Sequence, residues 1–130
     1  QRQMCIRDSK WVFITTVAGA TTLFNATIGE IASTEHGIAF ITDLHDECIT
    51  IAKSEKIQVC DDDLAQQRRF LSDKKSTWSS SMRRDMVNKS KIECAHIFLE
   101  LINIADKNNV ECPSLKTVMI NGEIYMRSLV

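Results

Sequence analysis

The sequence has few of the residues that interrupt helices and little of the pattern that forms strands. Its 130 residues include one proline and four glycines. Runs of four or more positions in which β-branched apolar residues alternate with polar residues, the pattern of a strand, are scarce. The length suits one domain around a single hydrophobic core. We therefore predict an all-α fold, a single multi-helix bundle.

Long apolar runs and a surplus of one charge are also lacking. Apolar runs such as 11–14 and 97–99 fall far short of the roughly 18 residues that a membrane-spanning helix needs. Sixteen Lys and Arg residues balance seventeen Asp and Glu residues, giving a formal net charge of −1, so no general field attracts a polyanion. No secretory signal opens the sequence. These observations predict a cytoplasmic protein with neither a nucleic-acid partner nor a membrane partner.

The sequence lacks the spacing of a metal site. Its five cysteines occur singly, without a Cys-x-x-Cys pair or a histidine at zinc spacing, so we expect reduced, mostly buried thiols. Asp61, Asp62 and Asp63 are adjacent, whereas the ligands of a calcium loop are spaced. We predict that these aspartates cap a helix beginning near Leu64 and that no metal is bound.

The first nine residues match a cloning sequence. Met4-Cys5-Ile6-Arg7-Asp8, followed by Ser9, is one reading frame of a transposon-end adapter used in shotgun sequencing. We therefore expect residues 1–9 to be an artefact that is not native, and the native domain to cover residues 10–130. The alternative is an ordinary polar N-terminus.

Apolar residues at helical spacing predict the order of the helices. A central helix over about 10–24 is apolar on nearly all sides, which is typical of burial, and a short turn over 28–32 follows it. Ser33 or Thr34 caps the next helix, which runs to about residue 56 and carries Glu47 on its solvated side. Further helices are predicted from about 64, over 81–87, over 91–107 and from Pro113, the last interrupted near 121–122.

Four stretches of the sequence resemble, in order, the C-terminal domain of the ketopantoate reductase family. Lys10 opens the buried helix, Thr27-Ile28-Gly29-Glu30 follows, residues 79–85 read Ser-Ser-Ser-Met-Arg-Arg-Asp, and Glu93 stands eleven residues after Met82. A turn at 109–113, ending in Pro113, resembles the one before the family's last helix. The resemblance implies the helical bundle that ketopantoate reductase shares with the C-terminal domain of 6-phosphogluconate dehydrogenase.

The resemblance covers only one part of a two-domain enzyme. In that family an N-terminal Rossmann domain holds NADPH, and the helical domain closes over it with a 2-keto acid between the two. The four glycines here, at 19, 29, 37 and 122, are too dispersed to form a Gly-x-Gly-x-x-Gly motif. We therefore expect the Rossmann domain to be missing, NADPH to be bound mainly by it, and the isolated chain to be inactive; a homodimer is left open.

The implied activity is that of a 2-dehydropantoate 2-reductase, an NADPH-dependent oxidoreductase of pantothenate biosynthesis. Reduction of a ketone by hydride leaves an alkoxide, which needs a proton or a fixed positive charge. By resemblance, Lys10 supplies the proton, Ser81 binds the substrate carboxylate, and Glu93 meets a substrate hydroxyl or orients the lysine. A glutamate buried on so apolar a helix would require such a partner.

The sequence departs from the family at two positions of the expected substrate site. The best-known members carry asparagines four and eight residues after the lysine, where this chain has Ile14 and Ala18. A substrate hydroxyl left unpaired there changes specificity. Two alternatives therefore stay open: a paralogue that reduces a different 2-keto acid, and a free-standing helical module that binds a protein partner.

Overall fold

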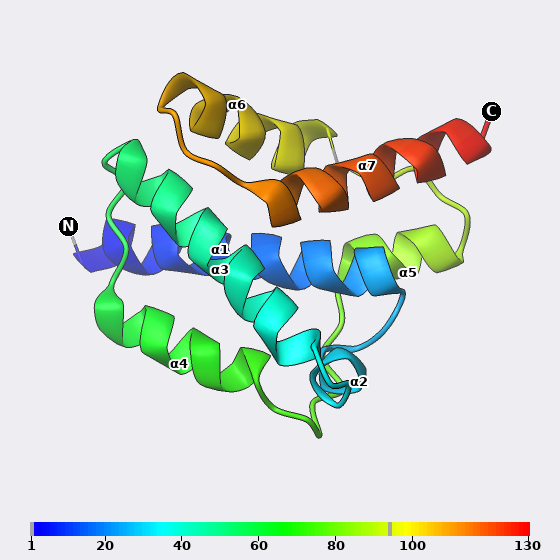
Figure 1. The fold of residues 1–130 in the computed structure, drawn as a ribbon, viewed down its shortest axis with the longest axis horizontal. Helices are drawn as coiled ribbons and strands as arrows, with labels where there is room; N and C mark the ends of the chain where they lie inside the picture. Colours follow the sequence, from blue (N-terminus) through cyan, green and yellow to red (C-terminus); the bar gives the residue numbers. More distant parts are fainter. Residues whose placement is uncertain (1, 94) are drawn as a thin grey trace.

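The computed structural model describes residues 2–93 and 95–130, and every regular element within those ranges is a helix (Figure 1). The elements are α1 (Arg2–Phe24), α2 (Ile28–Ala32), α3 (Gly37–Ser54), α4 (Asp61–Leu71), α5 (Ser81–Val87), the π-helix η1 (Ala95–Leu99), α6 (Glu100–Lys107) and α7 (Pro113–Ser128). The predicted all-α multi-helix bundle is confirmed. None of these helices combines the length and the apolar character needed to cross a bilayer.

Helix α1 is the central element, as predicted. It packs against α2, α3, α4, α5, η1 and α7, and in Figure 1 it runs through the middle of the molecule with α3 crossing it. Three of the buried hydroxyls on this helix are satisfied within it, because Thr16, Thr21 and Thr22 each donate to a carbonyl one turn earlier, at 2.7–2.9 Å. Such bonds allow a helix rich in threonine to lie in the core.

Helix α1 begins at Arg2, so the prediction that it starts near Lys10 is wrong. Ser9 is fully buried; its Oγ accepts a hydrogen bond from the backbone N–H of Cys60 at 2.8 Å, and its carbonyl accepts one from Gln67 Nε2 at 2.7 Å. Gln67 Oε1 in turn lies 2.9 Å from Nε2 of the buried His45. These bonds tie α1, α3 and α4 together. The adapter origin of residues 1–9 stays a prediction.

The cysteines agree only in part with the expectation of buried, reduced thiols. Cys48 and Cys112 are free and buried, and burial raises the pKa of Cys48 to about 12, which keeps it a neutral thiol. Cys60 is disulfide-bonded, so the expectation is wrong at that position. Cys94 lies outside the described residues, and nothing is described of the side chain of Cys5.

The boundaries of α3 and α4 differ from the prediction because polar side chains near them have other uses. Ser33 Oγ donates to the carbonyl of Gly29, and Thr34 Oγ1 to that of Ile31, so both hydroxyls close α2 and α3 begins at Gly37. The three aspartates form the first turn of α4 itself instead of capping it. Their negative charges at this end interact favourably with the helix dipole. No metal-binding cluster occurs among the described residues.

Glu47 was predicted on the solvated side of α3 and instead caps α7. Its two carboxylate oxygens accept hydrogen bonds from the backbone N–H groups of Ser114 and Leu115, at 3.0 and 2.9 Å. Cys112, at the N-cap position of α7, makes no side-chain capping bond. Glu47 therefore supplies the cap from a different helix. Helix α7 begins at Pro113, as predicted, and continues without interruption through residues 121 and 122.

The helix predicted over 91–107 has a different start. Its first regular turn is η1, which leads directly into α6, and residues 91–93 are not helical. The N–H groups of His96 and Ile97 both donate to the carbonyl of Glu93, at 3.1 and 3.0 Å. Ile92 is buried and its N–H lies 3.4 Å from the sulfur of Met126 on α7. The contact with α7 thus holds the segment that precedes the helix.

Candidate active site

A groove of about 190 Å³ lies between α1 and the start of α5. It contains three of the predicted substrate-binding residues, Ile14 and Ala18 from α1 and Ser81 from α5. Ile14 is 59% exposed, whereas Ala18 is buried. The groove is lined by Phe13, Ile14, Val17, Ala18, Trp78, Ser79, Ser80, Ser81, Met82 and Ile97.

Lys10 lines an adjoining pocket of about 200 Å³. This pocket lies between α1 and α4 and is also lined by Asp63, Gln66, Gln67 and Phe70, among others. Phe13 and Trp78 line both the groove and the pocket, so the two cavities share one wall. Lys10 and Ile14 are one helical turn apart and lie on the same face of α1.

The two rings of the shared wall, Phe13 and Trp78, form an aromatic cluster with Phe70. The Trp78 ring stacks on Phe70, with centroids 5.6 Å apart and planes at 21°, and meets Phe13 edge to face at 5.6 Å. Such arrangements suit the quadrupoles of aromatic rings. Trp78 and Phe70 nevertheless remain 50% and 45% exposed. The sequence did not predict that the Trp78 ring would line two cavities.

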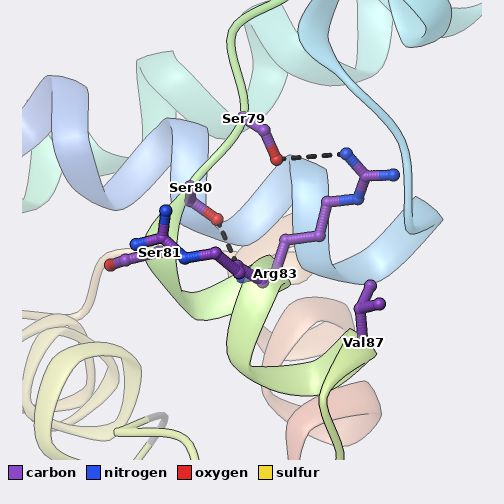
Figure 2. Close-up of a pocket in the computed structure, with 6 residues that line it drawn as sticks. Ser79, Ser80, Ser81, Arg83 and Val87 are labelled. Carbon is purple, nitrogen blue, oxygen red and sulfur yellow. Dashed lines mark hydrogen bonds between the residues drawn. The ribbon is translucent and has the colours of Figure 1, made fainter.

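Two of the three adjacent serines have hydroxyls that are used within the protein (Figure 2). Ser79 Oγ accepts a hydrogen bond from the Arg83 guanidinium at 3.2 Å, and Ser80 Oγ accepts one from the Arg83 backbone N–H at 3.1 Å. Ser80 also bonds Thr21 of α1 at 2.7 Å. Ser81 is exposed, and its hydroxyl makes no hydrogen bond within the described residues. Ser81 is therefore the serine whose whole hydroxyl is available to a ligand, and Ser79, which only accepts, keeps its O–H as a donor.

Helix α2 holds the loop that presents these serines. The N–H of Ile28 donates to the Trp78 carbonyl at 2.9 Å, and that of Gly29 donates to the Ser76 carbonyl at 3.0 Å. A Cβ on Gly29 would lie 2.3 Å from the Ser76 carbonyl oxygen, so only glycine allows this approach. Thr27 and Glu30 form a capping box at the start of α2. The Thr-Ile-Gly-Glu stretch thus positions the serine stretch.

Glu93 is not brought together with the other predicted residues. It lies on the non-helical segment before η1, it is exposed, and it lines neither the groove nor the Lys10 pocket. The expectation of a buried glutamate on a helix is therefore wrong. Lys10 is also exposed, and no ion pair joins it to Glu93 among the described residues.

Asp63 is a residue of the Lys10 pocket, whereas the sequence predicted it only as part of a helix cap. Its Oδ2 atom is buried and has no hydrogen-bond partner among the described residues, and the residue lines the same cavity as Lys10. A buried acceptor without a partner is costly. Its place beside α1 depends on how α4 packs, which the run of three aspartates does not reveal.

The described residues contain no strand from which a dinucleotide-binding turn could begin. Such cofactors bind at a glycine-rich turn between a strand and a helix, and no strand occurs in residues 2–93 or 95–130. The groove is lined by apolar side chains and serine hydroxyls, whereas the adjoining pocket also contains Lys10, Asp63, Gln66 and Gln67.

An all-α bundle with a groove along its central helix is the architecture of the helical domain of certain two-domain oxidoreductases. The family described as "Ketopantoate reductase PanE/ApbA C terminal" matches residues 4–121. The chain therefore belongs to the ketopantoate reductase family and corresponds to its C-terminal domain. The match begins inside the stretch that we predicted to be non-native.

Comparisons with individual proteins agree with this membership. The uncharacterized oxidoreductase YkpB of Bacillus subtilis is 33% identical over 117 residues, which cover 89% of this chain and 38% of YkpB. A dimeric ketopantoate reductase from Staphylococcus aureus matches with a TM-score of 0.83 at 17% identity, over 100% of this chain and 45% of that protein.

A D-mandelate dehydrogenase, solved with NADH and anilino(oxo)acetate, matches with a TM-score of 0.76 at 18% identity, over 94% of this chain and 40% of its own. At such identities the structural matches show the fold alone. The chain spans about two-fifths of the length of these relatives.

Proposed function

We propose that this chain is the substrate domain of a nicotinamide-dependent reductase of 2-keto acids, with NADPH held by a second domain. The observation that carries the proposal is the common wall of the two cavities, which brings the Lys10 pocket next to the groove of Ser81. An ammonium and a free hydroxyl are the two groups that a 2-keto acid needs, one for its ketone oxygen and one for its carboxylate.

The roles of the side chains follow from the charge that develops during reduction. The nicotinamide supplies the hydride when it is bound, and the ketone oxygen then carries negative charge. The Lys10 ammonium donates a proton to that oxygen, which stabilises the transition state more than the ground state. Ser81 donates a hydrogen bond to the carboxylate and fixes the orientation. Glu93 is the third member of the proposal and meets a substrate hydroxyl or orients Lys10 when the domains close.

The proposal also covers which 2-keto acid is reduced and which nicotinamide cofactor supplies the hydride. The relative from Staphylococcus aureus is a ketopantoate reductase, and reduction of ketopantoate in pantothenate biosynthesis is one candidate. The D-mandelate dehydrogenase bound anilino(oxo)acetate with NADH, so another 2-keto acid is the second candidate. The apolar residues Ile14 and Ala18 in the groove favour the second. A cytoplasmic homodimer completes the proposal.

The proposal is tested on the complete polypeptide that joins this chain to its nucleotide-binding domain. We expect NADPH oxidation with 2-keto acids, and we expect Lys10→Ala to lower kcat by about 10²- to 10⁴-fold, the usual contribution of a general acid. Lys53→Ala is the matched control, because Lys53 is an exposed lysine on α3 that lines neither cavity. Equal activity of the two variants would remove Lys10 from the mechanism. The isolated chain is expected to be inactive.

A further inference from the structure

We propose that the substrate is a 2-keto acid whose side chain is apolar and about as large as an aromatic ring, held between the Ile14 face of α1 and Trp78. This inference rests on the proposed function and adds to it the chemical class of the substrate. It assigns Ile14 and the Phe13–Trp78 wall as the residues that determine specificity.

The chemistry of the groove leaves hydroxyls only at its serine end. Ser80 uses its hydroxyl in bonds with Arg83 and Thr21, and Ser79 accepts one from Arg83, so the hydroxyl of Ser81 and the O–H of Ser79 remain for the carboxylate. The other lining residues are apolar: Phe13, Ile14, Val17, Ala18, Trp78, Met82 and Ile97. A hydroxyl on the substrate side chain would meet no partner among these apolar residues, which is unfavourable.

The placement of the two polar ends directs the side chain of the substrate to this lining. The ketone oxygen must lie within reach of Lys10 and the carboxylate near Ser81. Phe13 and Ile14 follow Lys10 by one helical turn, and Ala18 follows by two. The third substituent of the ketone carbon therefore lies against Phe13, Ile14 and Trp78, which border the space between the two polar groups.

The size of the groove matches an aromatic ring. An apolar cavity of about 150 Å³ in another protein accommodates benzene, and this groove has about 190 Å³. Ala18 contributes to the space because its side chain is small, and an asparagine at that position would reduce it.

Trp78 of the shared wall and its neighbours Ile14 and Phe70 leave apolar surface that a ligand can cover. Ile14, Phe70 and Trp78 are 59%, 45% and 50% exposed, and leaving large apolar side chains in water costs about 25 cal/mol per Å². The second possible occupant is the nucleotide-binding domain. We assign the substrate, because Ile14 and Trp78 line the same groove as the free hydroxyl of Ser81.

The test compares substrates on the complete enzyme with its nucleotide-binding domain. We expect kcat/KM for phenylpyruvate to exceed that for ketopantoate and for pyruvate by about tenfold or more, in line with what an apolar pocket discriminates. Ile14→Asn is expected to lower the ratio of phenylpyruvate to ketopantoate by at least about tenfold, and Trp78→Leu to lower it in the same direction. Ile124→Asn is the control, since Ile124 is 63% exposed on α7 and lines neither cavity.

The possible outcomes distinguish failure of this inference, the preference for an apolar side chain, from failure of the proposed reductase function. If no 2-keto acid is reduced, the proposed function fails. If ketopantoate or pyruvate is preferred, the function stands and the inference is overturned. If Ile14→Asn and Trp78→Leu lower kcat/KM equally for every substrate, the wall contacts the nucleotide-binding domain, and the inference is again overturned. Circular dichroism of each variant confirms that the helices are retained.

Discussion

We predict that replacing Glu47 by alanine destabilises the domain more than the same replacement of an exposed carboxylate on α3. The Glu47 carboxylate accepts two hydrogen bonds from the first N–H groups of α7, those of Ser114 and Leu115. Leu115 is fully buried, so water cannot readily replace the carboxylate there. The substitution leaves these donors without partners and removes a negative charge from the positive end of a helix dipole.

The magnitude follows from the two bonds. Loss of a capping side chain costs about 1 kcal/mol, and a hydrogen bond to a charged group contributes about 1.5–3 kcal/mol. Two bonds to a charged group sum to about 3–6 kcal/mol, and because Glu47 is only half-buried we discount this to about 2–4 kcal/mol. In a chain of this length a change of 1 kcal/mol shifts Tm by about 4 °C, so Tm should fall by about 8–16 °C. Glu47→Gln keeps one of the two acceptor oxygens and loses the charge, so its loss should be smaller than that of Glu47→Ala but at least about 1 kcal/mol.

Urea unfolding and thermal unfolding of the 130-residue chain, followed by circular dichroism, measure these changes. Asp43→Ala is the matched control, because Asp43 is an exposed carboxylate on the same helix, and its free energy of unfolding should change by less than about 0.5 kcal/mol. A loss for Glu47→Ala no larger than that of the control would show that the inter-helix cap does not stabilise the fold.

Two further predictions concern the packing around the cavities. Burial lowers the pKa of His45 below its ordinary value, so the unfolded chain binds a proton more readily than the folded chain. The free energy of unfolding is therefore unaffected by this histidine above the unfolded-state pKa of about 6.5. Below that pKa it falls by at most about 1.4 kcal/mol per pH unit. Urea titrations from about pH 7.5 to about pH 5 measure this loss. The parent chain and the control His36→Gln, which alters an exposed histidine, should both lose stability over this range, and His45→Gln should lose less. An equal dependence of the free energy of unfolding on pH in all three proteins would contradict the role of His45. Gly29→Ala should lower the free energy of unfolding by more than about 2 kcal/mol, because its Cβ would overlap the Ser76 carbonyl. Gly19→Ala is the milder comparison, because its Cβ would meet the Leu44 side chain at 3.2 Å. An equal loss for the two variants would refute the argument from the close approach at Gly29.

The helices were predictable because their signals are local. The apolar character of residues 12–23 and the position of Pro113 led to α1 and α7 directly. The errors lie where a distant element uses a side chain that looked solvated or local. Glu47 binds the start of α7, 67 residues further along the chain, and no periodicity on α3 reveals such a partner. The segment before η1 is likewise held by α7.

The candidate site was predictable only where residues share an element or follow one another closely. Lys10, Ile14 and Ala18 recur at four-residue steps on one helix, so their common face followed from helix geometry. The Ser81 side chain joins them because a loop returns to α1, and only the ordered resemblance pointed to it. Asp63 and the Phe13–Trp78 contact arise from the packing of α4 and the loop, which the sequence pattern does not encode.

The exposure of Ile14 bears on how such a domain acquires new substrates. A side chain that is 59% exposed contributes little to the core, so its replacement leaves the folding free energy nearly unchanged. Lys10, one turn away, keeps its place on a helix that is secured from its opposite side. Under the proposed function, single substitutions at this position can therefore change the preference for one 2-keto acid over another at little cost in stability.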